Sequence, residues 1–402
     1  MYKNSNCQVC KKISSILCEQ CNNPTYFCSK AHLNQHKQKF HKSNSVSHKI
    51  PTNNNTPNFQ NQNLNNKNYS TQNNFRNFNE YNQHLRKEII NKMTLQDYTS
   101  AISLINEYVN LSKEHYQSDN HPQIIEMMYT LAECHLNLSN LEESKNILNE
   151  ITSLTENSNN NINLIFRQKA CMLLGAILLN IGEYNNALKY YFICETDLPK
   201  ICKEPELNVK LSSVYLNISL CFIYLKNKNI AEKYLKKGLS QTEGILGNDT
   251  IHKLNADIFE NLGVVYELMN RFKDSLIFYK KSLKLKFNLY GEIHDEVLEL
   301  QYKISGIYLS LKQFQQAEEI LSSIVELILK QKIQNSPPEA IYRYSTYFYT
   351  YGVVLIKLNK MNNAKIYLNK VLEIVDGFLL PNDPWIYNIN DLLRLCDSKS
   401  NK

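Results

Sequence analysis

Glycine and proline are scarce in this sequence, with 10 of each among 402 residues. These residues mark turns and interrupt helices, so their scarcity argues against a turn-rich β protein and favours a largely helical one. Long apolar runs are missing as well: no segment approaches 18 consecutive apolar residues, and the first ten residues (MYKNSNCQVC) have no apolar core. The sequence therefore predicts no membrane span and no secretory signal, and a chain kept in the cytoplasm with reduced thiols.

The motifs of common catalytic sites are also missing. The sequence contains no GxGxxG, no phosphate-binding loop, no GxSxG and no HExxH. Isolated His115, His252 and His294 fall in predicted turns between helical hairpins, without partner ligands. The predicted finger, from residue 7, and the predicted helical repeats, from about residue 85, leave no stretch of the chain for a methyltransferase domain of the SET type. We therefore expect a protein without catalytic activity.

Positive charge is concentrated at one end. Residues 1–50 contain eight lysines and one acidic residue, Glu19, which accounts for the whole net charge of +7. The remainder of the chain is close to neutral, so attraction to an acidic partner is expected at the N-terminal segment.

The eleven cysteines divide into two groups. Five lie between positions 7 and 28, and six are scattered singly through apolar helical pattern. The scattered six are expected to be buried core residues. They are Cys134, Cys171, Cys194, Cys202, Cys221 and Cys396.

The N-terminal cysteines and histidines have the spacing of zinc ligands. They run Cys7-x2-Cys10-x7-Cys18-x2-Cys21-x6-Cys28-x3-His32, followed by His36, His41 and His48. A Cys-x2-Cys turn presents two thiolates to one tetrahedral Zn²⁺, and eight ligands complete two closed sites. Closed sites leave no position for a reactive water, so both zinc ions should be structural. So short a segment has almost no apolar core and is expected to fold only with metal.

At these residues the sequence resembles the MYND-type zinc finger and its relative, the HIT-type finger. The stretch FCSKAH, residues 27–32, is similar to an element that both families share. The resemblance implies a cross-braced arrangement. Cys7, Cys10, Cys28 and His32 would bind the first zinc, and Cys18, Cys21 and two later histidines the second. His41 matches one of these, and either His36 or His48 is the last ligand, with His36 favoured. Fingers of these families bind proteins. Nucleic acid is disfavoured because the lysines are dispersed and no helix presents them.

An asparagine-rich segment separates the finger from the rest of the chain. Residues 52–82 hold 14 asparagines among 31 positions, with few aliphatic side chains. This composition cannot bury enough apolar area to fold, so residues 51–84 are expected to be a flexible linker. A second interpretation treats its aromatic residues as anchors for a partner. They are Phe59, Phe75, Phe78 and Tyr81.

Residues 85–396 have a helical pattern that repeats. A small residue is followed twelve positions later by Ala or Ser, six times, at successive offsets of 43, 44, 44, 42 and 47 residues. A larger side chain follows each first member three positions later. Small residues let antiparallel helices approach closely while a large neighbour fills the groove. The pairs are Ala132/Ser144, Gly175/Ala187, Ser219/Ala231, Gly263/Ser275, Ser305/Ala317 and Gly352/Ala364. A further hairpin is partly visible around Tyr98 and Ala101, which makes about seven.

This pattern resembles the tetratricopeptide repeat, in which the eighth and twentieth positions are small. The long period is similar to that of the kinesin-light-chain-like variety. The resemblance implies an all-α helical superhelix that binds proteins or peptides. Asn217 and Asn261 fall at the sixth position of successive repeats, where the resemblance places side chains facing the groove. An asparagine there can hydrogen-bond the backbone of an extended peptide. Ordinary solvated polar residues are the alternative.

A MYND-like finger joined to kinesin-light-chain-like repeats resembles a scaffold of motile cilia and flagella. That resemblance implies an axonemal component that pairs with another tetratricopeptide protein and associates with inner-arm dynein. The basic N-terminal segment would suit an acidic tubulin or dynein surface. A cytosolic assembly factor for dynein arms and a nuclear co-repressor-like adaptor are the alternatives.

Overall fold

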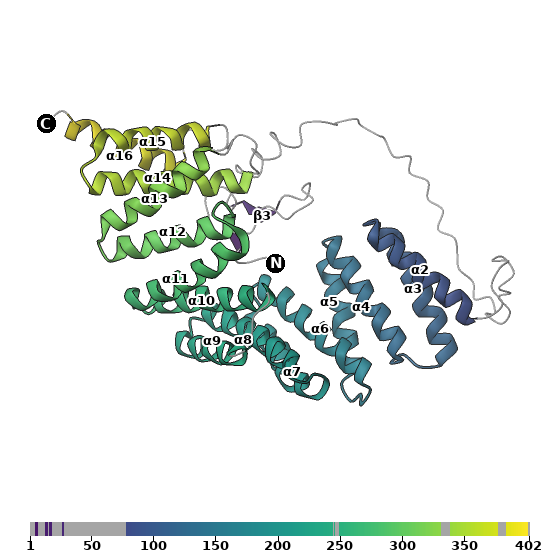
Figure 1. Ribbon diagram of the computed structural model, residues 1–402. Coiled ribbons are helices and arrows are strands. Elements are labelled where there is room, and N and C mark those ends of the chain that lie inside the picture. Colours follow the sequence, from purple (N-terminus) through teal and green to yellow (C-terminus); the bar gives the residue numbers. More distant parts are fainter. Residues whose placement is uncertain are drawn as a thin grey trace, which may run out of the picture. The chain divides into compact units, whose positions relative to one another are not determined.

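Figure 1 presents a computed structural model that describes residues 78–243, 245, 249–330, 338–376 and 383–400. Four two-residue strands near the N-terminus are also described: β1 (Ser5–Asn6), β2 (Ile13–Ser14), β3 (Ile16–Leu17) and β4 (Tyr26–Phe27). Strand β1 pairs with β2 in antiparallel register, with Ser5 opposite Ser14. The eight predicted zinc ligands and the asparagine-rich segment up to residue 77 lie outside the described residues.

From Phe78 onward the described chain is helical. In chain order the helices are α2 (Phe78–Thr94), α3 (Tyr98–Tyr116), α4 (Pro122–Asn137), α5 (Leu141–Leu154), α6 (Asn161–Asn180), α7 (Tyr184–Ile201), α8 (Glu206–Tyr224), α9 (Lys228–Thr242), α10 (Asp249–Leu268), α11 (Phe272–Tyr290), α12 (Asp295–Ser310), α13 (Phe314–Lys330), α14 (Pro338–Lys357), α15 (Met361–Val375) and α16 (Pro384–Ser400). In chain order the first fourteen form seven helix–turn–helix hairpins, and α16 follows. The array divides within α6, between Ile177 and Leu178, into two compact units.

The same three-residue turn closes all seven hairpins. Its middle residue has a positive φ, between 58° and 86°. In the first hairpin Gln96 occupies this position, and Asp97 N–H donates to the carbonyl of Lys92 while Gln96 N–H donates to that of Met93. These bonds form a Schellman motif, which satisfies the last carbonyls of the first helix. The other middle residues are Ser139, Gly182, Lys226, Asn270, Lys312 and Asn359, with the same two bonds in each turn.

The repeated small residues are all buried, as the pattern predicted. At Gly263 an added Cβ would lie 2.4 Å from the ring of Tyr279, so only glycine fits. Tyr279 comes from the second helix of the hairpin, sixteen positions later, and Leu368 covers Gly352 from the same relative position. Tyr279 therefore occupies the space directly over Gly263. Tyr266, the larger residue three positions after Gly263, is also buried and packs its ring against Phe278 of α11, with centroids 5.3 Å apart.

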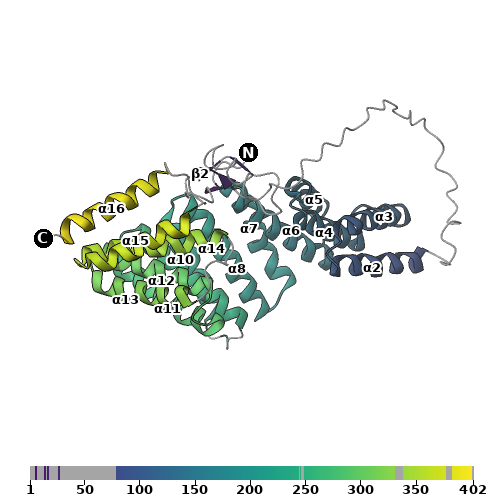
Figure 2. The ribbon, with the colours of Figure 1, turned by 90° about the horizontal axis from the view of Figure 1, so that it is seen from above.

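The helices form because their apolar side chains recur at helical spacing. In α13 the buried residues are Ala317, Leu321, Ile324, Val325 and Ile328, which lie on one face. Within the larger unit α12 contacts α13, α13 contacts α14, and α14 contacts α15, and these helices lie side by side in Figures 1 and 2. The core is therefore continuous from one hairpin to the next.

Helix α2 begins inside the segment that the sequence assigned to the linker. The ring of Phe78 stacks on His115 with centroids 3.8 Å apart, and Tyr81 is buried with its hydroxyl donating to Glu107 at 2.5 Å. Burial of Tyr81, Leu85 and Ile89 against α3 stabilises a helix that composition alone disfavours. The interpretation of Tyr81 as an anchor for a partner is therefore wrong, whereas for Phe78, which is half-buried, it stays a prediction.

Five of the six scattered cysteines are buried, which confirms the prediction for those five. Cys202 is the exception: it is half-exposed at the end of α7, and its Sγ lies 3.4 Å from Lys210 Nζ. His115, in the last turn of α3, and His252, in α10, lie inside helices rather than in turns between hairpins.

Among the described residues, α6 and α8 are long and apolar enough to cross a membrane by length and composition. The core helix of a globular array passes the same test, and α8 packs against α7 and α9.

Candidate interaction surface

No group of three or more Cys, His, Asp or Glu side chains suited to a metal occurs among the residues that the structure describes. The predicted zinc ligands Cys7, Cys10, Cys18, Cys21, Cys28, His32, His36 and His41 lie outside that part of the chain. Within the described part of the chain, the candidate functional groups are therefore polar side chains of the helical array.

Polar side chains join each hairpin to the next at the period of the repeat. Lys303 of α12 donates to Glu260 of α10, 43 residues earlier, at 2.5 Å. Lys237 of α9 donates to Glu195 of α7, 42 residues earlier, at 2.6 Å. Other links of this kind are Arg86 with Glu126, Asn163 with Asn120, Tyr302 with Thr350, and Lys360 with Glu318. These contacts fix the orientation of successive hairpins within each unit.

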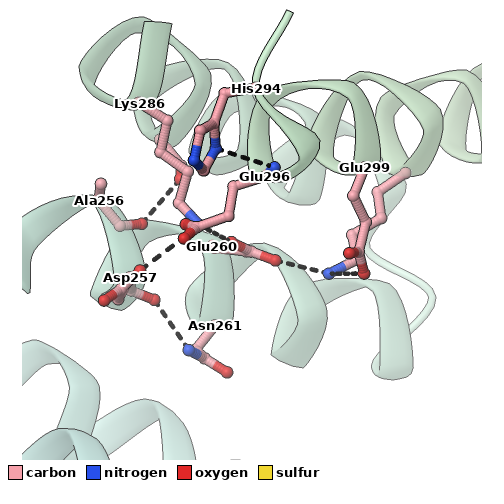
Figure 3. Close-up of polar contacts among 10 residues, drawn as sticks. Ala256, Asp257, Glu260, Asn261, Lys286, His294, Glu296 and Glu299 are labelled. Atoms are coloured by element: carbon pink, nitrogen blue, oxygen red, sulfur yellow. Dashed lines mark hydrogen bonds and ion pairs between the residues drawn. The ribbon is translucent and has the colours of Figure 1, made fainter. Parts of the chain in front are cut away.

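The densest of these links surrounds a buried lysine. Figure 3 shows Lys286 reaching from α11 to carboxylates of α10 and α12. Its Nζ lies 2.7 Å from Glu260, 2.8 Å from Glu296 and 3.5 Å from Asp257. Only 5% of Lys286 is exposed, so this charge is removed from water. We call the following residues the charge cluster: Asp257, Glu260, Lys286, Glu296, Glu299 and Lys303.

Local sequence places three members of the charge cluster. His294 caps α12, and its Nδ1 accepts a hydrogen bond from Glu296 N–H at 3.3 Å, which fixes Glu296 in the first turn. An acidic residue in the first turn also interacts favourably with the helix dipole. Asp257 and Glu260 are three residues apart on α10 and therefore share a face.

In the charge cluster, burial and the neighbouring charges shift the pKa values of the side chains in opposite directions. Burial disfavours the charge of Lys286, but its hydrogen bonds to Glu260 and Glu296 outweigh this and raise its pKa above the ordinary lysine value. Burial also acts to raise the pKa of Glu260, and the fields and hydrogen bonds of Lys303 and Lys286 reverse the effect and lower it. For Asp257 burial dominates, so its pKa is raised. Two lysines face four carboxylates, so the cluster presents a net negative charge.

An aromatic region of α12 and α14 continues from the charge cluster. The hydroxyls of Tyr302 and Thr350 are 3.0 Å apart, and the rings of Tyr302 and Tyr347 have centroids 4.6 Å apart. One turn after Tyr302, Gly306 has no neighbour within 4 Å of where its Cβ would stand. Tyr347 is itself buried, so Tyr302 is the member of this pair that reaches the surface, close to the open position at Gly306.

The two asparagines singled out in the sequence lie on α8 and α10. Asn217 and Asn261 are both half-buried. Asn261 Nδ2 donates to the carbonyl of Asp257 in its own helix at 2.8 Å, as Figure 3 shows. That bond uses one of the two donor hydrogens of Asn261, and recognition of a peptide by either residue stays a prediction.

Sequence reasoning missed the charge cluster. The separation of 43 residues between Glu260 and Lys303 equals the repeat period, so opposite charges one period apart were an available signal. Lys286 gave no such signal, because α11 contains five lysines and the sequence does not show which of them is buried among carboxylates.

Comparison with known proteins supports the register of the repeats. A family model described as Tetratricopeptide repeat matches residues 125–158, 212–243, 256–289 and 345–374. Counted from the first residue of each match, the eighth and twentieth positions are the small residues identified from the sequence. They are Ala132/Ser144, Ser219/Ala231, Gly263/Ser275 and Gly352/Ala364. No curated protein matches the sequence.

Solved structures resemble the array at low sequence identity. The apo form of RapI is 15% identical, with 75% of this chain and 78% of that chain covered and a TM-score of 0.54. A signal-transduction ATPase with a tetratricopeptide repeat sensor from Pyrococcus horikoshii is 13% identical, with 79% and 44% covered and a TM-score of 0.54. BtubC (BKLC) from P. vanneervenii is 15% identical, with 64% and 94% covered and a TM-score of 0.49. At such identities the likeness concerns the fold alone. The chain therefore contains tetratricopeptide repeats, and the part described from Phe78 onward is an all-helical array of the tetratricopeptide type.

Proposed function

We propose that this protein is a non-catalytic scaffold that holds other proteins along its helical array. The observation that carries the proposal is the regularity of the array: one turn closes every hairpin, and polar links join successive hairpins at the repeat period. Side chains on such a support are held in fixed positions, which lowers the entropy lost on binding. The partly exposed carboxylates of α10 and α12, with Tyr302 beside them, form the candidate surface.

We further propose that the scaffold belongs to the ciliary axoneme, with another tetratricopeptide protein, inner-arm dynein and the tubulin surface as partners. The finger spacing through His32 and the stretches LQDYTSAISLI (95–105) and MYTLAECHLNLSNLEESKNIL (128–148) support this, because they resemble zinc finger MYND domain-containing protein 12. The missing last finger ligand, with Ser45 near the position expected for it, and the long asparagine-rich insert are departures from that resemblance. A cytosolic assembly factor for dynein arms shares every sequence feature and differs only in where the protein resides.

The test is to tag the chain in a ciliated cell and separate cilia into a membrane-plus-matrix fraction and an axoneme fraction. Retention on the axoneme and release by high salt together with dynein are expected for a resident scaffold. Recovery only in the cell body would overturn the axonemal proposal. It would leave the assembly factor or a nuclear adaptor, which nuclear fractionation distinguishes.

The N-terminal finger is proposed to hold two structural Zn²⁺ ions through the eight ligands predicted from the sequence. Thiolate and imidazole ligands at Cys-x2-Cys and Cys-x3-His spacing support this donor set. Elemental analysis of the full chain should give two zinc ions, and His36→Ala should lower that content while His48→Ala leaves it unchanged. The reverse result would assign the last ligand to His48.

A further inference from the structure

The outward face of α11 carries lysines and apolar side chains and no acid. Its exposed residues recur at intervals of three, four and seven, so they form one line along the helix. Ile277 is 52% exposed and Phe287 is 46% exposed. We call the following residues the basic stripe: Lys273, Ile277, Lys280, Lys281, Lys284 and Phe287.

The lysines of the basic stripe have no carboxylate partner among the described residues. Lys280 lies over the ring of Tyr308 at 5.5 Å, and Lys281 over that of Phe278 at 5.3 Å, so both ammonium groups rest on aromatic faces. The only acid of α11, Asp274, is bound by Arg271 at 2.8 Å. The positive charge of the stripe is therefore not neutralised by the array.

Lys286, on the opposite side of α11, has the contrary environment. It lies thirteen residues after Lys273, which places it on the inner side of the helix, where Glu260 and Glu296 bind it. The carboxylates of α10 and α12 are thus directed at the inner lysine, and the outer lysines are left without them.

The helix α9 adds to the positive charge. Lys233, Lys236 and Lys237 are exposed on its outer face, and α9 packs on α10 as α11 does. Lys236 pairs with Glu232 and Lys237 with Glu195, whereas Lys233 has no ion pair among the described residues. The repeats are close to neutral in total, but the outer faces of α9 and α11 carry a local excess of positive charge. An acidic partner can therefore be attracted here as well as at residues 1–50.

We propose that the basic stripe docks an acidic segment of a partner protein, one that carries aspartate or glutamate together with apolar side chains. The stripe spans 15 residues of helix from Lys273 to Phe287, or about 21 Å, which an extended segment of about six or seven residues matches. Carboxylates of the segment would pair with Lys280, Lys281 and Lys284, and its apolar side chains would cover Ile277 and Phe287. This inference names a partner class for the proposed scaffold and rests on it.

The composition of the stripe favours a protein over nucleic acid or a membrane. A phosphate backbone would leave Ile277 and Phe287 facing charged oxygens, and the stripe has no arginine for paired contacts with phosphate. A helix that binds a lipid surface inserts a continuous apolar face, whereas the inner face of α11 is committed to the array.

The test measures binding of the full chain to a fluorescent 14-residue peptide of glutamate pairs separated by single leucines. The stripe variant is Lys280→Glu/Lys281→Glu/Lys284→Glu. The matched control is Lys189→Glu/Lys312→Glu/Lys330→Glu, which makes the same charge change at exposed lysines on other helices and turns. The basic residues 1–50 are present in every protein, so they contribute equally and cancel in the comparison. Circular dichroism confirms that each variant is folded.

We expect the stripe variant to bind the peptide at least about tenfold more weakly than the control, because three ion pairs are lost and replaced by repulsion. Ile277→Ser/Phe287→Ser should weaken binding about threefold or more without altering charge. Equal weakening in stripe and control variants would overturn the proposal, as would an unchanged affinity in the apolar variant. Double-stranded DNA or phosphatidylserine vesicles that bind through the stripe while the peptide does not would overturn it too. The fractionation of the tagged chain tests the proposed scaffold separately, so a failure of the peptide to bind through the basic stripe does not change that result.

Discussion

Replacing Lys286 by methionine tests whether the charge cluster holds three helices together. Methionine keeps the length and apolar stem of lysine, so the main change is the loss of the ammonium group. Glu260 is 17% exposed, Asp257 31% and Glu296 40%, and all three then lose a shared partner. Removing one partner of a buried ion pair costs roughly 3–5 kcal/mol. Because the carboxylates are partly exposed and Glu260 keeps Lys303, we expect the lower end, about 3 kcal/mol.

The loss should be local, since each hairpin of a repeat array contacts mainly its neighbours. Hydrogen exchange followed by mass spectrometry separates the helices, which a single melting curve does not. A change of about 3 kcal/mol corresponds to roughly 100-fold faster exchange through opening of α10, α11 and α12. The control is Lys284→Met, two residues away on the outer face and without an ion pair, which should change stability by less than about 0.5 kcal/mol. If the two variants exchange alike, the charge cluster does not stabilise the array.

The dependence on pH has a defined sign. Without Lys286, the pKa values of Asp257 and Glu260 should both rise, because each carboxylate loses a cation that favours its charged form; for Asp257 burial already holds the pKa above its ordinary value. A carboxylate with a raised pKa destabilises the folded state at neutral pH, and this effect disappears as pH falls through the raised value. In the natural protein Glu260 has a lowered pKa, so its stabilising contribution is lost on acidification. The difference between the two proteins should therefore shrink as pH falls from 7 toward about 5 and below. A difference that grows on acidification would refute the reasoning.

Three further predictions follow from the packing. Gly263→Ala should lower the free energy of unfolding by about 1–2 kcal/mol, because the new methyl group meets the buried ring of Tyr279. Gly306→Ala, where the methyl group meets nothing, should raise it by up to about 1 kcal/mol. Denaturant unfolding measures both, and equal effects would contradict the packing. Lys226→Gly should raise the free energy of unfolding by about 0.5 kcal/mol, because φ is 61° at this turn, and a loss would show that the lysine side chain matters there. Burial raises the pKa of the Cys221 thiol to about 12, so at pH 8 a maleimide should label Cys202 well before Cys221 in native protein, as judged by peptide mass, and the reverse order would contradict the burial.

The sequence predicted the array well because its signals are local or strictly periodic. Ala132/Ser144 and Gly352/Ala364 are twelve residues apart within a hairpin, and the same spacing recurs along the chain. Apolar spacing in α13 predicts a helix for the same reason: neighbours on one helical face are set by the geometry of the backbone. The turns were less visible, because only Gly182 of the seven left-handed residues is glycine.

Composition misplaced the start of the array for a physical reason. The segment around Phe78 and Tyr81 is rich in asparagine, which has a modest helix propensity. Packing of Tyr81 and Leu85 on α3 overrides that propensity, and sequence alone does not indicate which surface is available.

The sequence by itself determined the number of hairpins, their register and the small residues at their crossings, since these depend on contacts within about twenty residues. Only the tertiary structure decided which charges are neutralised. Lys284 and Lys286 are two residues apart in one helix, yet one is exposed and the other is 5% exposed among Asp257, Glu260 and Glu296. That difference depends on how neighbouring hairpins pack. Successive helical positions turn by about 100°, so a shift of two residues exchanges a water-facing side for an interior one.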